Sequence, residues 1–221
     1  MSSLSLNING KFIHSTETVK LLGITIDNKL SFKQHIEAVC SNASLKTKAL
    51  SRIRRYLSHN QANTLCNSYI LSAFSYCPII WMFSSKKANS LISSVYKRSI
   101  RTVENDFSLS LEEILVHTNR SNCHQRNLEL LVLEIYKSIN CLNPELMWEL
   151  FPKTNPKYGL RSGQNVEIPK TSTRFGMKSF VFRGALAWNH LPKALKDIPS
   201  LLDFKNVLKG TKIHCHCKIC S

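Results

Sequence analysis

The chain has 221 residues, of which 43% are hydrophobic and 20% charged, with seven Gly and seven Pro. This composition suits a folded protein and excludes a collagen repeat, a small disulfide scaffold and a disordered tail. The 30 Lys and Arg against 14 acids give a net charge of +16. An excess of this size favours a polyanionic partner, most often nucleic acid, over a surface that is merely basic and well solvated.

Neither a membrane nor a secretory segment is predicted. No apolar run approaches the ~20 residues of a membrane helix, and residues 1–11 lack a basic start followed by an apolar stretch. We therefore expect an intracellular protein, cytoplasmic or nuclear, without membrane contact. Five cysteines agree with a reducing compartment, because a free cysteine in an apolar segment behaves as a small hydrophobe: Cys40, Cys66, Cys77, Cys123 and Cys141.

The N-terminal part is predicted to be β structure. Residues 4–13 alternate apolar and polar side chains, with a possible tight turn at Asn9-Gly10. Residues 19–26 are a second apolar run rich in β-branched side chains. Two or three short strands cannot bury a face alone, so this β piece needs a partner within the chain or outside it.

A long amphipathic helix is predicted over residues 32–57, with Ser31 and Gln34 as a capping box. Its apolar side comprises Ile36, Val39, Ala43, Leu50, Ile53 and Leu57. Lys48, Arg52 and Arg55 cluster on the opposite side, whereas Lys46 and Arg54 fall towards the apolar side. The cluster predicts either contact with nucleic acid or a solvated face.

The rest of the chain is predicted to be helical with one long loop. Pro78 should kink or restart the second helix and leave Ile79, Ile80 and Trp81 buried. Ser110 and Ser200 are expected helix caps, and Pro144 opens a short turn after Asn143. The expected helices cover residues 61–75, 86–104, 110–117, 123–140, 179–188 and 200–208, and the loop covers 151–178 with a short strand near 165–168.

No motif for catalysis is present. The sequence lacks a phosphate-binding loop, a dinucleotide fingerprint, a zinc-protease motif and a nucleophile elbow. It also lacks the paired carboxylates that a two-metal mechanism requires. The C-terminal tail places His214, Cys215, Cys217 and Cys220 at spacings that Zn²⁺ accepts. The alternative is an exposed, reduced tail, because no second ligand pair follows at a distance.

Several separated segments resemble the part that follows the catalytic core in reverse transcriptases of jockey/CR1-like non-LTR retrotransposons. The longest runs from Val19 to Asp27, followed by Leu30-Ser31-Phe32 and His35-Ile36. The others are Ser75-Tyr76-Cys77-Pro78 with Trp81, Tyr96-Lys97-Arg98, residues 158–162, Phe182-Arg183-Gly184-Ala185 with Trp188-Asn189, Leu191-Pro192, and the closing cysteines. The segments keep the family's order over almost the whole chain.

The resemblance implies a mainly α fold in four parts. Residues 1–30 would be palm-end strands with a primer-grip-like hairpin, 31–105 a helical thumb-like bundle, 106–210 a mixed, loop-rich C-terminal region, and 211–221 the Cys/His tail. Leu22, Gly23 and Ile24 match the primer-grip turn, and Lys20 flanks it. Lys48, Arg52 and Arg55 fit the thumb by position only. Arg183 and Trp188 match a motif without a defined role, for which we expect a structural part.

Three functions are compatible with this pattern. The first is a post-catalytic fragment of an RNA-directed DNA polymerase that binds an RNA or DNA template–primer without reading sequence. It would lack the palm aspartates, and would therefore be no enzyme without the palm and fingers that precede it in the parent polymerase. The second is a protein-interaction module or a degenerate copy without function. The third, an active polymerase, would require aspartates from another chain.

Overall fold

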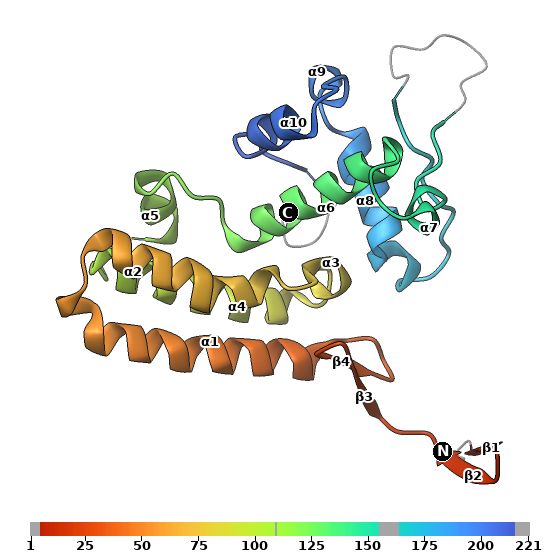
Figure 1. Cartoon of the computed structure of the whole chain (residues 1–221), viewed down its shortest axis with the longest axis horizontal. Helices are drawn as coiled ribbons and strands as arrows, with labels where there is room; N and C mark the ends of the chain where they lie inside the picture. The colour runs from red at the N-terminus through yellow and green to blue at the C-terminus, as the bar shows by residue number, and fades with distance from the viewer. Residues whose placement is uncertain (1–4, 109, 155–163, 215–221) are drawn as a thin grey trace.

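The computed structural model describes residues 5–108, 110–154 and 164–214 (Figure 1). Two small antiparallel hairpins form its N-terminal end, and the elements after them are mostly helices. This confirms the mainly α fold class. The helices surround two hydrophobic cores, one formed mainly by residues 36–123 and the other by residues 128–213 with Met82 and Phe83.

Both hairpins reverse through two consecutive residues with positive φ. Strands β1 (Ser5–Ile8) and β2 (Lys11–His14) join at Asn9 and Gly10, which confirms the predicted turn. Strands β3 (Thr18–Leu21) and β4 (Ile24–Asp27) join at Leu22 and Gly23. The apolar run over 19–26 is therefore a hairpin rather than one strand, because such turns match the right-handed twist of the flanking strands.

The carboxylate of Asp27, at the end of β4, orders the turn that leads into the first long helix, α1 (Lys33–Ile53). Its carboxylate accepts hydrogen bonds from the backbone N–H groups of Lys29, Ser31 and Phe32, at 3.1, 3.1 and 2.7 Å, and from the Ser31 hydroxyl. The predicted capping box of Ser31 and Gln34 is wrong. Phe32 is the N-cap residue and adopts a left-handed conformation with no side-chain cap.

The first core lies between α1 and α4 (Lys86–Glu104), which pack along each other (Figure 1). The predicted helix over 61–75 is three segments: α2 (His59–Leu65), the π-helix η2 (Cys66–Ile70) and the 3-10 helix η3 (Leu71–Ser75). Pro78 restarts the chain as α3 (Pro78–Trp81), with Trp81 buried as predicted. Ile80 is instead 51% exposed. The 3-10 helix η1 (Arg54–Tyr56) and α5 (Leu111–His117) complete this half.

The second core forms around α6 (Cys123–Ile139) and α8 (Phe180–Asn189). The remaining elements are α7 (Glu145–Trp148), η4 (Gly176–Lys178), α9 (Lys193–Lys196) and α10 (Leu201–Leu208). The sequence did not predict α9, which is a single turn. In the predicted loop, a bridge pairs Lys153 with Val166, near the expected strand at 165–168.

The five cysteines outside the tail divide into two groups. Cys40, Cys66 and Cys123 are buried, as predicted, whereas Cys77 and Cys141 are exposed. Both exposed cysteines have positive φ, so they occur where a helix is interrupted rather than on an apolar face. Across the described ranges, no helix is both long and apolar enough to cross a bilayer.

Candidate nucleic-acid interface

The turn between β3 and β4 projects its backbone to the surface. Leu22 is 82% exposed, and its carbonyl oxygen accepts a hydrogen bond from the Tyr76 hydroxyl at 2.7 Å. Gly23 has φ of +85°, a conformation that strains other residues. Tyr76, which directly follows η3, therefore holds the turn in place, and Gly23 permits the backbone conformation of the turn.

The two neighbours of this turn in the candidate site differ in exposure. Lys20 is exposed and pairs across the hairpin with Thr25, on the face opposite Val19 and Leu21. Ile24 is only 4% exposed, on the strand that contacts α1. The side chain of Ile24 thus belongs to the interior, and only Lys20 and the turn itself present groups to a ligand.

The predicted basic stripe of α1 lies on the surface. Lys48 and Arg52 are exposed on the last turns of α1, and Arg55 is exposed on η1 with its guanidinium 4.7 Å from the ring centre of Tyr56. The only acid of α1 is Glu37, which forms an ion pair with Lys33 near the other end. Lys48 and Arg52 on α1, with Arg55 just beyond its end, have no acid of α1 near them and give this end of the helix a positive surface. Positive charge here also interacts favourably with the negative end of the helix dipole.

Lys46 and Arg54 point away from this stripe, as the helical periodicity predicts. The Lys46 ammonium donates to the Tyr69 carbonyl oxygen at 3.1 Å and lies 4.0 Å from the ring centre of Tyr69. Arg54 donates to the carbonyl oxygens of Val103 and Leu57, at 2.8 and 2.9 Å. These two cations hold elements together, and the stripe consists of Lys48, Arg52 and Arg55.

The turn and the stripe lie at opposite ends of α1 (Figure 1). The helix has 21 residues, so it is about 30 Å long. Base pairs of B-form DNA follow one another at about 3.4 Å, so a ligand that touches both ends would extend over about nine base pairs. The structure does not bring the candidate residues into one compact site.

The Phe182-Arg183-Gly184-Ala185 and Trp188-Asn189 segments have a structural explanation. Trp188 is fully buried and donates to the Gln164 carbonyl oxygen at 2.8 Å, as expected for a core residue. The Asn189 amide exchanges two hydrogen bonds with the backbone of Val166, at 3.0 and 2.9 Å. The segment therefore fastens the loop before α8 onto that helix.

The predicted zinc ligands cannot be described as a set. His214 is exposed, while Cys215, Cys217 and Cys220 lie outside the described residues. Within the ranges that the structure does describe, no group of three His, Cys, Asp or Glu residues is placed to hold a metal ion. The zinc hypothesis thus depends entirely on the tail.

Sequence reasoning missed two features of this surface. The resemblance included Tyr76 but assigned it no part, and only the fold shows that it supports the turn at Leu22. Sequence reasoning also missed that two basic segments, residues 120–126 at the start of α6 and residues 205–212, come together in the fold. No local pattern signals this second feature, because the two segments are far apart in the chain.

Comparison with known proteins finds similarity over part of the chain. A stretch of 114 residues, half of this chain, is 30% identical to an uncharacterized protein of Caenorhabditis elegans. The match covers 58% of that protein, so the chain spans less than two thirds of the relative's length. No family model and no solved structure matches the chain.

Proposed function

We propose that this chain binds a template–primer duplex of RNA or DNA without reading its sequence, as the post-catalytic part of a non-LTR retrotransposon reverse transcriptase. The exposed stripe of Lys48, Arg52 and Arg55 carries this proposal. Cations on a helix surface neutralise backbone phosphates, which supply affinity but no sequence information. The motifs stated above resemble segments that follow the palm in that family, so polymerisation would require palm aspartates, for which this sequence has no motif.

The uncovered N-terminal hairpin supports a further partner for this end of the molecule. Leu6, Ile8, Phe12 and Ile13 are each more than half exposed. No helix packs on β1 or β2 with more than marginal contact in the described part of the chain. Such a two-stranded hairpin is at best marginally stable alone, so a covering surface such as the remainder of a palm sheet would stabilise it.

The test is binding of the full chain to a labelled RNA–DNA hybrid with a recessed primer, followed by fluorescence anisotropy over a range of salt concentrations. The unaltered chain should show a linear log–log dependence with a slope of about −0.9 per neutralised phosphate. The triple variant K48E/R52E/R55E should bind more weakly, and its slope should be shallower by about 2.7, since three contacts are lost.

A matched control is the triple variant R174E/K178E/K193E, which changes the net charge equally at exposed positions of the second half. If both triple variants weaken binding to the same extent, the stripe of Lys48, Arg52 and Arg55 is not the binding site for nucleic acid. A flat salt response of the unaltered chain would contradict the proposal altogether.

A protein-interaction module is the second candidate, and the exposed apolar residues of β1 and β2 favour it. This reading predicts a chain that ignores nucleic acid and forms a defined oligomer. Sedimentation of the unaltered chain and of the variant I8K/F12K distinguishes the two, because only the second reading requires the apolar hairpin for assembly.

A further inference from the structure

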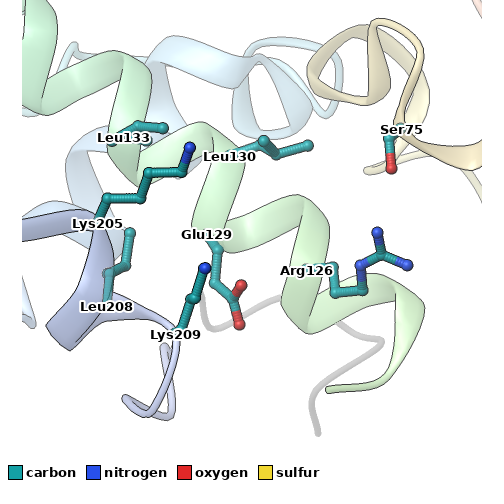
Figure 2. Close-up of a pocket in the computed structure, with 8 residues that line it drawn as sticks. All are labelled: Ser75, Arg126, Glu129, Leu130, Leu133, Lys205, Leu208 and Lys209. Carbon is teal, nitrogen blue, oxygen red and sulfur yellow. The ribbon is translucent and has the colours of Figure 1, made fainter. Parts of the chain in front are cut away.

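Three hollows that share lining residues run along the junction of the two cores. The first, of about 290 Å³, lies between α6 and α10 and has Arg126, Glu129 and Lys209 in its wall (Figure 2). The second, of about 330 Å³, shares these three residues and adds Arg120. The third, of about 300 Å³, shares Arg120 and Lys209 and adds Lys212. We call the three together the basic groove.

The groove concentrates positive charge from two distant parts of the chain. Five cations line it against one carboxylate, that of Glu129: Arg120, Arg126, Lys205, Lys209 and Lys212. The amide of Gln125 donates to the Thr211 carbonyl oxygen at 3.0 Å, which holds the two basic segments side by side. The fold, rather than a local charge run, creates this surface.

The groove also has an apolar wall. Leu130 and Leu133 of α6 line the first hollow together with Leu208 of α10. Figure 2 shows Lys209 beside Glu129, Lys205 directed towards Leu130 and Leu133, and the guanidinium of Arg126 directed towards Ser75. Cations beside a leucine-lined wall suit a ligand that carries both negative charge and apolar surface.

We propose that the basic groove binds a single strand of nucleic acid, with phosphates on its cations and bases against its leucines. Positively charged grooves that follow the phosphate backbone are usual sites for single strands, whose bases most often stack on aromatic side chains. In the basic groove the leucine wall would supply the contact with the bases. Each hollow has the size of a small ligand pocket, and their shared walls suit an extended chain better than a compact ligand. A guanidinium group such as that of Arg126 matches the geometry of phosphate oxygens. The guanidinium of Arg120 donates to the side-chain oxygens of Asn63 and Asn67, so Arg120 adds mainly positive charge to the groove.

This inference rests on the proposed function, because the same cations would also accept the carboxylates of an acidic peptide. It adds a second contact to the duplex contact on α1. The convex surface of α1 would carry the duplex, and the groove would carry the unpaired extension of one strand.

Glu129 allows a test of whether the ligand of the groove is negatively charged. Its carboxylate accepts a hydrogen bond from the Ser121 hydroxyl at 3.0 Å. Glu129→Gln keeps an oxygen for this bond and removes the charge that opposes phosphates. The variant should bind a single strand several-fold more tightly, whereas Glu134→Gln, on α6 but outside the groove lining, should not.

The main experiment uses the full chain with an oligothymidylate of about 16 nucleotides, a common site size, and with a blunt duplex of the same length. The double variant K205E/K209E should lose about tenfold or more in affinity for the single strand, since two phosphate contacts become repulsive. Its affinity for the duplex should fall no further than that of K178E/K193E, which carries the same change in charge on exposed positions.

Equal losses in the groove variant and in its control would overturn the inference. Poly-L-glutamate that binds the groove in preference to oligothymidylate would also overturn it, and would assign the groove to an acidic peptide. If K205E/K209E unfolds by circular dichroism, the Glu129→Gln result decides, and no gain in affinity contradicts the inference. The proposed function survives these failures if K48E/R52E/R55E still weakens duplex binding.

Discussion

The hydroxyl of Tyr76 donates a hydrogen bond of 2.7 Å to the carbonyl oxygen of Leu22, 54 residues earlier in the chain. This bond fastens the turn between β3 and β4 to the helical half of the molecule. We predict that Tyr76→Phe releases the turn at a cost of about 1 kcal/mol, as for one net hydrogen bond. Hydrogen exchange should accelerate in residues 18–27 and remain unchanged in α4.

The matched control is Tyr69→Phe. Tyr69 is also exposed, but its ring and its carbonyl oxygen, rather than its hydroxyl, contact Lys46. Faster exchange over 18–27 in both variants would show that the Tyr76 hydroxyl does not hold the turn.

Asp27 should matter for stability, because its carboxylate satisfies backbone N–H groups ahead of α1. We predict that Asp27→Ala lowers the free energy of unfolding by about 1–2 kcal/mol, because the turn before α1 loses its charged hydrogen-bond acceptor. Urea unfolding at neutral pH measures this change. Glu167→Gln, which changes an exposed acid of the loop before α8, serves as the control and should have little effect.

The same carboxylate predicts a dependence on pH. Burial raises the pKa of Asp27, but the hydrogen bonds from Ser31, Phe32 and Lys29 together outweigh it and lower the pKa below its usual value. A lowered folded pKa gives stability that is present above the unfolded value of about 3.9 and is lost as pH falls through the folded pKa. The difference in unfolding free energy between the unaltered chain and Asp27→Asn should therefore shrink on acidification. A constant difference would contradict this assignment.

The Cys/His tail predicts bound zinc. Zinc content of the purified chain, measured by mass spectrometry, should be about one ion per chain, since Zn²⁺ takes four ligands of this kind in structural sites. The double variant C217S/C220S should lose it, and C77S/C141S, which alters two exposed cysteines elsewhere, should keep it. Absence of zinc from the unaltered chain would remove the hypothesis.

The periodic helices were predictable from sequence, but the points where regular structure breaks were not. The predicted 86–104 helix is confirmed as α4, and Ser110 caps α5 as expected, because apolar spacing and caps are local signals. The start of α1 depends on Asp27 and on positive φ at Phe32, which a capping pattern does not report. The basic groove depends on contacts between distant segments, and only the fold brings these together.

Gly184 lies where α8 packs against α6. A Cβ atom at this position would be 2.8 Å from the Cδ1 atom of Ile135 and 3.3 Å from the ring of Phe151. We predict that Gly184→Ala lowers the free energy of unfolding by about 1–2 kcal/mol, because overpacking of the second core outweighs the ~1 kcal/mol that alanine gains over glycine inside a helix. Gly210→Ala, where a Cβ would be 3.9 Å from the nearest backbone atom, should be nearly neutral. Equal denaturation midpoints for the two variants would contradict this packing argument.

The cysteines predict a division in chemical reactivity. Burial raises the pKa of Cys40 and of Cys66 to about 11 and that of Cys123 to about 12, so these thiols remain protonated and inaccessible. In a background with the three tail cysteines changed to serine, a disulfide reagent at about pH 8 should modify two thiols quickly, Cys77 and Cys141.

The other three should react only at the rate of unfolding, and all five should react at once in denaturant. Because the unfolded thiols ionise near pH 8.5 and the folded ones do not, stability should also fall as pH rises above that value. Peptide mapping should locate the quickly modified thiols at Cys77 and Cys141. Each of the variants C77S and C141S, made in the same background, should lose one quickly modified thiol. Rapid modification of Cys123 in the native chain would show that the first core does not close over it.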